Sequence, residues 1–418
     1  MIKNIKKSSF YLISHLTLLA FGCSLFFSMS SSAATPNLFG DRDGIQLAHD
    51  ASGHTFEATF TIDLMTNLEG GVDEGFEAPG NLDLIAWLDT GAAGWWNNGT
   101  FHLYLLANSG GDPSARIGDF QGTSNIEAVN TFKVYEAWYE HRFLEDRFSI
   151  LLGLHDYNSE FYVLEYAGLF INSSFGIGAE VAQVGPSIFA STALAARLAW
   201  QPTNNTYLKT VVYDGVPGDP GDPRGTHISF DKGDGLFLGI EGALLGGEDP
   251  SIPGYYKLGL GGWYHTMEFE DFRGATRDDN RGFYIIGEQL LFSEKDVSQG
   301  LGAFMQLGLT ESDRNQVDLY IGAGIHYTGL LPGRDEDIIG LAYAHAGTSD
   351  NFIDANPGME EGETVVEFSY QFAITPWLIV QPDVQYIIDP GMVNTVDDVV
   401  VFNLRLQINP GVLVTDPG

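Results

Sequence analysis

The stretch HTFEATFTIDLMTN, residues 54–67, alternates apolar and polar side chains along its whole length. Phe56, Phe60 and Ile62 fall on one face of an extended chain, whereas Thr59 and Thr61 fall on the other. Side chains of a β-strand point to opposite faces in turn, so this alternation predicts a strand with one apolar and one polar surface. Soluble sandwiches and transmembrane barrels both use such strands, and one strand does not distinguish the two architectures.

The number and spacing of such segments are more informative. We predict sixteen strands, at 54–66, 81–90, 99–107, 130–140, 147–154, 191–200, 206–213, 235–243, 255–265, 282–291, 301–309, 317–327, 337–345, 363–373, 377–387 and 398–408. Their connections alternate between long segments, such as 155–190, and short turns, such as 201–205. Bacterial transmembrane barrels have an even number of strands, long outer loops and short periplasmic turns, and their strands have about 9–11 residues. The sequence therefore predicts an all-β fold, a transmembrane antiparallel β-barrel, in a single domain over residues 35–418.

Residues 1–34 have the order of a secretory signal peptide: basic MIKNIKK, an apolar run over 10–29 and small residues over 30–34. A retained membrane anchor, or a lipoprotein signal ending at Cys23, are the alternatives for this segment. Cys23 is the only cysteine, so cleavage after it leaves no cysteine for a disulfide or a thiolate metal site. The chain is expected to be exported.

The formal net charge of −35 excludes most nucleic-acid binders, because phosphate binding needs a basic surface. In an aqueous channel, the same acidity would favour cations. The histidines lack the HExxH spacing, and neither a G-x-S-x-G elbow nor a P-loop occurs. The acidic pieces DRDG (41–44) and GDPGDP (218–223) lack the full spacing of a calcium loop. We therefore expect no enzyme activity, catalytic residue, metal site or cofactor.

The longest connection mixes aromatic, amide and hydroxyl side chains, and loops of this length are usually functional. We predict that its segment 156–187 folds into the barrel and narrows the lumen, together with segment 111–130. Its candidates for contact with a polar ring are Glu160, Phe161 and Asn172.

The strand FKVYEAWYEH, residues 132–141, supplies further candidates. If Tyr135, Ala137 and Tyr139 face lipid, then its alternate residues face the lumen, namely Glu136, Trp138 and Glu140. An aromatic ring can stack on the C–H face of a sugar while carboxylates accept its hydroxyl protons. The alternative is that the carboxylates pair with basic wall residues. Arg197 is the candidate cation, and we place it across the lumen from these acids.

Several irregular motifs, namely LFINSSFG (169–176), GPSIF (185–189), ARLAWQP (196–202) and YDGVPGDP (213–220), resemble the carbohydrate-selective porin family of OprB type. The resemblance recurs along nearly the whole mature chain and implies a sixteen-stranded barrel of the bacterial outer membrane. The segment GDFQGTSNIEA (118–128) also resembles the family's pattern and adds Asp119, Gln121, Asn125 and Glu127 to the lumen candidates. One departure is the extension after the last strand, residues 409–418, where outer-membrane barrels usually end on an aromatic residue.

The function expected from these features is passive, carbohydrate-selective diffusion across the cell outer membrane. Small sugars and outer-membrane lipid are the expected partners, and the sequence leaves open whether the chain forms a homo-oligomer. Two alternatives remain at this point: a general cation-preferring porin, and a structural or adhesive barrel with a plugged lumen.

Overall fold

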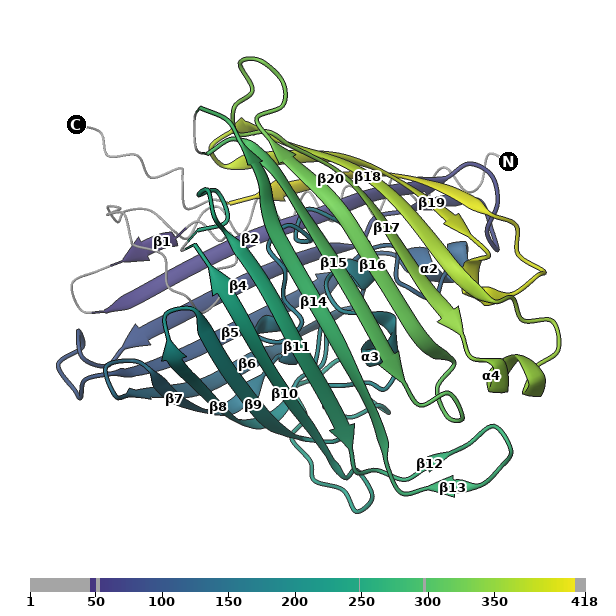
Figure 1. Ribbon diagram of the computed structural model, residues 1–418, viewed down its shortest axis with the longest axis horizontal. Coiled ribbons are helices and arrows are strands. Elements are labelled where there is room, and N and C mark those ends of the chain that lie inside the picture. The colour runs from purple at the N-terminus through teal and green to yellow at the C-terminus, as the bar shows by residue number, and fades with distance from the viewer. Residues whose placement is uncertain (1–45, 50–52, 248, 296–297, 410–418) are drawn as a thin grey trace.

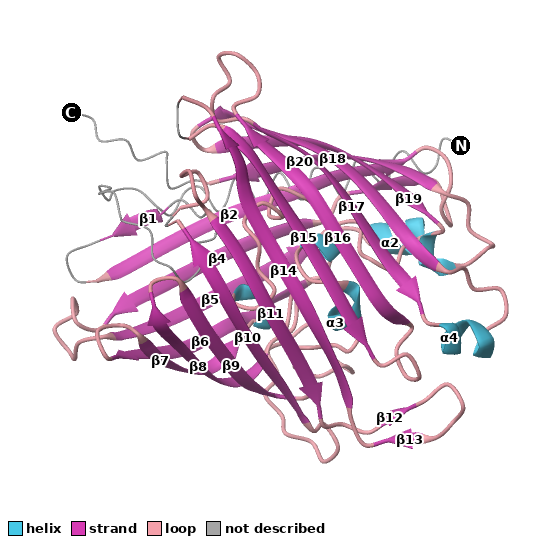
Figure 2. Ribbon diagram, viewed as in Figure 1, coloured by secondary structure: helices cyan, strands magenta, loops and turns pink. Residues whose placement is uncertain are grey.

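The computed structural model describes residues 46–49, 53–247, 249–295 and 298–409 (Figure 1). Strands dominate it, and the few helices are short (Figure 2). One antiparallel sheet contains 18 strands, and β2 pairs with both β4 and β20, which closes the sheet into a barrel. The wall strands are β2 (His54–Asn67), β4 (Gly80–Asp89), β5 (Gly99–Ser109), β6 (Thr131–Phe143), β7 (Phe148–His155), β8 (Ala193–Thr203), β9 (Thr206–Asp214), β10 (Leu236–Gly246), β11 (Tyr256–His265), β14 (Asn280–Ser293), β15 (Gly300–Thr310), β16 (Val317–Thr328), β17 (Ile338–Thr348), β18 (Gly362–Thr375), β19 (Leu378–Ile388) and β20 (Val399–Ile408).

The remaining two strands of the sheet, β1 (Gln46–His49) and β3 (Gly75–Glu77), pair only with β2, so the wall itself has sixteen strands. The closing register pairs Phe60 with Ile408 and Leu64 with Leu404. A closed sheet has no edge whose backbone groups would meet lipid unpaired, which is the condition for spanning a bilayer with strands. The predicted barrel and its strand number are confirmed, and the predicted strand bounds agree with the observed ones to within three residues.

The apolar face of each wall strand points outward. Outward positions carry exposed large hydrophobic side chains on neighbouring strands, for example Leu103, Leu260 and Phe283. The alternate positions of β2 point inward and are buried, among them Thr61 and Asp63. Lipid outside and a polar interior explain this distribution, because each face then meets a medium of its own polarity.

The lengths of the connections sort by the end of the barrel, as predicted. Long connections leave the end that contains the C-terminus of β2, at 68–79, 110–130, 156–192, 215–235, 266–279, 349–361 and 389–398. A single short one, 311–316, shares that end. The long connections contain the short elements α2 (Pro113–Ile117), η1 (Tyr157–Ser159), η2 (Ser173–Phe175), α3 (Ala179–Ala182), β12 (Phe269–Glu270), β13 (Thr276–Arg277), α4 (Asp350–Ala355) and η3 (Pro390–Met392). Long connections in transmembrane barrels are extracellular, which orients the molecule.

One predicted side-chain direction is wrong. Tyr104 pairs with Glu136 and Leu105 with Val134, so Tyr135 is the extra residue of a β-bulge. Tyr135 is therefore turned inward instead of toward lipid, and its side chain is only 1% exposed. Strict alternation cannot anticipate this, because the bulge places neighbouring residues on the same side of the wall.

Among the described residues, no helix has the length and apolar character needed to cross a membrane. The predicted signal peptide, Cys23 and the segment DRDG lie outside the described residues, as do positions 410–418 of the C-terminal extension. The signal peptide and the extent of the single domain stay predictions.

The outward and inward faces of β2 can be tested directly. Phe60→Arg should impair insertion, because a lipid-facing arginine near the midplane costs about 2–4 kcal/mol. Thr59→Arg should insert normally, because Thr59 pairs across strands with Asp83 on the inner face, where the new cation meets an acid. Heat-modifiable migration of folded barrels on gels measures insertion. Equal defects in the two variants would contradict the assignment of faces.

Candidate functional site

The connection 156–192 turns back into the barrel and packs against the inner wall. Tyr157, Phe161 and Tyr162 are each 0% exposed. Tyr157 packs against Phe237 of β10 at 5.4 Å between ring centroids, and Tyr162 packs against Tyr284 of β14 at 4.3 Å. The rings of the connection and the rings of the wall bury each other, and this holds the connection on one side of the lumen. The predicted inward fold of this segment is confirmed.

Glutamates of the wall bind the backbone of this connection. Glu241 of β10 accepts a hydrogen bond from the N–H of Tyr162 at 2.8 Å. Glu288 of β14 accepts one from the N–H of Tyr166 at 3.0 Å. An irregular segment enclosed by a barrel cannot give its N–H groups to a neighbouring strand, so another acceptor must satisfy them. A carboxylate is suited to this because it accepts several hydrogen bonds at once.

Two further glutamates of β18 act in the same way. Glu367 accepts hydrogen bonds from the N–H groups of Ile171 and Asn172. Glu363 accepts them from Phe120 and Gln121, which belong to the other infolded connection, 110–130. We refer to Glu241, Glu288, Glu363 and Glu367 together as the wall carboxylates.

The two infolded connections also bind each other. The N–H of Ser173 donates to the carbonyl of Gly122 at 2.8 Å, and the N–H of Asn125 donates to that of Ile171 at 2.9 Å. The connection 110–130 is tied to the wall by Ser124, whose hydroxyl donates to Asp63 of β2. The lumen is thus narrowed by both segments named in the sequence analysis.

Arg197 of β8 forms a buried ion-pair centre. Its Nη2 atom lies 2.8 Å from Glu140 of β6 and 2.7 Å from Glu160 at the start of the infolded connection. The Arg197 side chain is 2% exposed and the Glu140 side chain 4%. The expected position across the lumen is wrong: β8 and β6 both pair with β7, so Arg197 and Glu140 lie on adjoining parts of the same wall.

An aromatic row lines the inner wall beside this centre, made of Trp87 on β4, His102 on β5 and Trp138 on β6. The three residues face one another in register across the strands. The His102 and Trp138 rings stack at 4.4 Å with an interplanar angle of 11°, and Trp87 lies 5.2 Å from His102. Both tryptophans are half-buried, unlike the fully buried rings on the opposite side.

The predicted lumen candidates separate by exposure. Those that keep some exposure are Asp119, Asn125, Glu127, Trp138 and Glu160. Those that are buried are Gln121, Glu136, Glu140, Phe161, Asn172 and Arg197. Each buried polar member has a protein partner; Glu136, for example, accepts from the N–H of Asp156 at 2.8 Å. Burial assigns this second group to holding the infolded segments rather than to contact with a passing solute.

Four carboxyl groups of the infolded segments have shifted pKa values, and burial raises the pKa of Glu180 to about 7. Burial raises the pKa of Asp119 to about 6. Burial, followed by a hydrogen bond with Asp112, raises the pKa of Glu127 to about 8. Burial alone would also raise the pKa of Glu160, but Arg197 and Lys209 outweigh it and hold that pKa well below its usual range.

The wall carboxylates, Trp87 and His102 were not among the predicted site residues. A signal for them exists in the sequence, because Trp87 falls on the polar face of the alternating segment 81–89. Glu241 likewise interrupts the run LFLGIEGALLG of β10 at an inward position. A charged side chain at an inward position of a wall strand needs a partner, which an infolded segment can supply. Within the residues that the structure describes, no group of three His, Cys, Asp or Glu side chains could hold a metal ion.

Comparisons with known proteins agree with this geometry. The family model described as carbohydrate-selective porin, OprB family, matches residues 41–409. Porin B of Pseudomonas aeruginosa is 25% identical over 434 residues, covering 90% of this chain and 93% of that protein. The putative porin QuiX of Acinetobacter baylyi is 23% identical over 417 residues, covering 89% of this chain and 92% of QuiX.

Solved structures show the same fold. The high-pH structure of Pseudomonas putida OprB superposes with a TM-score of 0.77 at 20% identity, covering 86% of this chain and 94% of OprB. The outer-membrane channel DcaP of Acinetobacter baumannii gives a TM-score of 0.55 at 10% identity, covering 86% of this chain and 98% of DcaP.

A closed sixteen-stranded barrel with an apolar outer face and a narrowed polar interior defines a porin of the bacterial outer membrane. The match over residues 41–409 makes the assignment specific. This chain belongs to the OprB family of carbohydrate-selective porins, and it is an outer-membrane channel for sugars.

The ion-pair centre should dominate the stability of the narrowed lumen. Arg197→Met leaves the buried Glu140 and the largely buried Glu160 without their shared cation, which should lower the free energy of unfolding by about 3–5 kcal/mol. Arg142→Met is the matched control. Arg142 also bonds Glu140, at 3.1 Å, but its side chain is 27% exposed, so the loss should stay below about 1 kcal/mol. Urea unfolding in detergent micelles measures both, and equal losses would refute the central role of Arg197.

The raised pKa of Glu127 predicts a pH dependence. The folded protein favours the protonated carboxyl, so the associated stability is complete near the ordinary pKa of a glutamate and is lost as the pH rises toward about 8. Glu127→Gln keeps a neutral side chain at every pH. The variant should therefore gain stability relative to the natural protein between pH 5 and pH 9, as measured by urea midpoints across that range. A constant difference would show that Glu127 does not titrate in this window.

Proposed function

We propose that sugars pass between the joined infolded segments and the inner wall of β4, β5 and β6, over the aromatic row Trp87, His102 and Trp138. The observation that carries this proposal is the uneven filling of the barrel. The connection 156–192 packs its rings against β10, β14, β15 and β16, where Phe237, Tyr284, Phe304 and Tyr320 are buried. The tryptophans on the opposite wall keep part of their surface exposed.

Trp138 occupies a central place in this path. Glu136 and Glu140 flank it on the same inward face of β6, and both are engaged, Glu136 by the backbone of Asp156 and Glu140 by Arg197. The Trp138 ring itself stacks on His102 at 4.4 Å, and this contact limits its rotation. A fixed indole beside polar groups can stack on the C–H face of a sugar ring while its hydroxyls meet hydrogen-bonding partners.

Asp119, Asn125, Glu127 and Glu160 are the polar groups that we assign to the same path. Asn125 is exposed and accepts a hydrogen bond from Arg405 of β20 at 2.7 Å. Contacts of this kind are individually weak, and weak contacts suit a channel because a bound solute must also leave. Transport is passive, and the proposal involves no covalent step.

A second candidate property, preference for cations, is favoured by the net charge of −35. Reversal potentials across a salt gradient test it. Potentials near zero would leave sugar selectivity as the single selective property of the channel.

Replacement of Trp138 tests the path. Trp138→Ala should weaken the block of ion current by monosaccharides about 2- to 10-fold, the value of one aromatic contact, and should raise the conductance. Trp200→Ala is the control, because Trp200 faces outward and is 48% exposed. Single-channel recording with glucose as the probe measures both quantities, and liposome swelling confirms that each variant conducts. Unchanged block and conductance in Trp138→Ala would remove the aromatic row from the path and leave the family assignment intact.

A further inference from the structure

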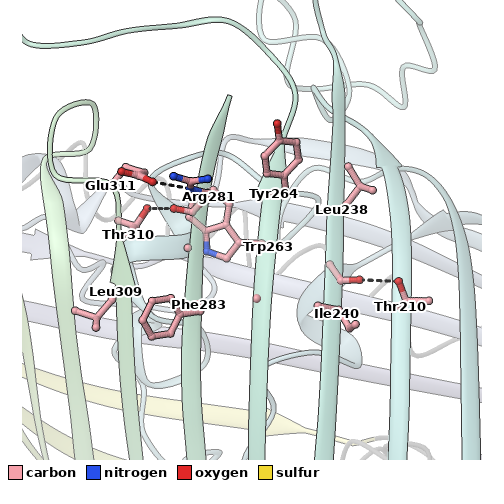
Figure 3. Close-up of a pocket in the computed structure, with 13 residues that line it drawn as sticks. Thr210, Leu238, Ile240, Trp263, Tyr264, Arg281, Phe283, Leu309, Thr310 and Glu311 are labelled. Carbon is pink, nitrogen blue, oxygen red and sulfur yellow. Dashed lines mark hydrogen bonds and ion pairs between the residues drawn. The ribbon is translucent and has the colours of Figure 1, made fainter. Parts of the chain in front are cut away.

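The outer face of the barrel carries a groove of about 580 Å³ across β10, β11, β14 and β15 (Figure 3). Its walls are the outward side chains Leu238, Ile240, Phe283 and Leu309. It lies near the end of the barrel with the long connections, since Leu309 is close to the C-terminus of β15. The groove therefore opens toward the outer leaflet of the membrane.

A single missing side chain creates the groove. Gly262 of β11 stands in register between Ile240 of β10 and Phe283 of β14. The outward positions on either side of it, Leu260 and Tyr264, carry large exposed side chains. A Cβ atom on Gly262 would lie 3.4 Å from the nearest atom, a backbone oxygen, so neither crowding nor a left-handed backbone requires glycine here. The backbone therefore does not require glycine at position 262, and the effect of this glycine is to leave a hollow in the outer surface.

One end of the groove is polar. Arg281 lies above Phe283 on the same face of β14, and its side chain is 62% exposed. Its Nε atom bonds Glu311 at 2.6 Å, which engages one edge of the guanidinium group. A guanidinium has five N–H donors, so the bond to Glu311 leaves donors for a second anion. The Thr310 hydroxyl donates to the carbonyl of Arg281 and fixes the backbone at this point.

We propose that this groove binds one acyl chain of a phosphorylated lipid of the outer leaflet, with the lipid phosphate at Arg281. Two observations favour a lipid as the occupant. The groove is continuous with the apolar outer belt, which in a porin of the outer membrane already contacts lipid. A cation also lies at the end of the groove nearest the headgroup layer, and arginine pairs well with phosphate. The volume is within the usual range for small-molecule sites.

The test compares two glycine variants. Gly262→Leu fills the groove from its floor. Gly242→Leu is the matched control: Gly242 also faces outward, on β10, and its Cβ atom would lie 3.5 Å from the nearest atom. The probe is lipid A added to the purified barrel in mild detergent, and native mass spectrometry measures the bound fraction. The natural protein and Gly242→Leu should retain one lipid A, whereas Gly262→Leu should lose at least 10-fold in retention. Liposome swelling with glucose should be unchanged in both, which shows that they fold.

Arg281→Gln tests the polar end independently of the glycine variants. It should reduce retention of lipid A about 3- to 10-fold and leave retention of fully dephosphorylated lipid A unchanged. Equal retention of lipid A by the natural protein, Gly262→Leu and Arg281→Gln would overturn the proposal. So would dissociation of a homo-oligomer by Gly262→Leu without a change in lipid retention, because that result would make the groove a contact between copies of this chain.

Discussion

Backbone N–H groups of the infolded segments need acceptors inside the barrel, and the wall carboxylates supply them. Glu241, Glu288 and Glu367 bind the connection 156–192, and Glu363 binds the connection 110–130. Each carboxylate is buried and stays so only because several hydrogen bonds compensate its loss of water. This mutual requirement holds the segments in one position, and the cross-section of the channel follows from it.

Because the infolded segments need acceptors and ion-pair partners, part of the net negative charge has a structural role. Glu140 and Glu160 share Arg197, and the wall carboxylates are engaged by backbone donors, so these acids are not lone charges along the passage. The opposite wall has a different composition, with half-buried tryptophans on β4 and β6 around His102. Glu136 and Glu140 of this wall also hold the infolded connection, through Asp156 and through Arg197 and Glu160, so anchoring groups lie on both sides of the barrel.

The outer face follows simpler rules, because lipid is an almost uniform partner. Large apolar side chains form a belt, and a single glycine is enough to interrupt it where its neighbours Ile240 and Phe283 are large. The groove at Gly262 shows how a position without a side chain can shape a surface that alternation alone describes only as apolar.

Alternation in the sequence determined the strands, their number and the direction of most side chains, because a period of two residues is a local property of an extended chain. The parity of the connection lengths determined that the strands close into a membrane barrel. Only the tertiary structure decided the direction of Tyr135, since a bulge depends on the partner strand. It also decided that Arg197 binds Glu140 and Glu160 and that Phe161 and Asn172 are buried. The contacts of Trp87 and Trp138 with the ring of His102 likewise appear only in the tertiary structure. These contacts join segments far apart in the chain, and their positions depend on the curvature and closure of the barrel, which no local pattern records.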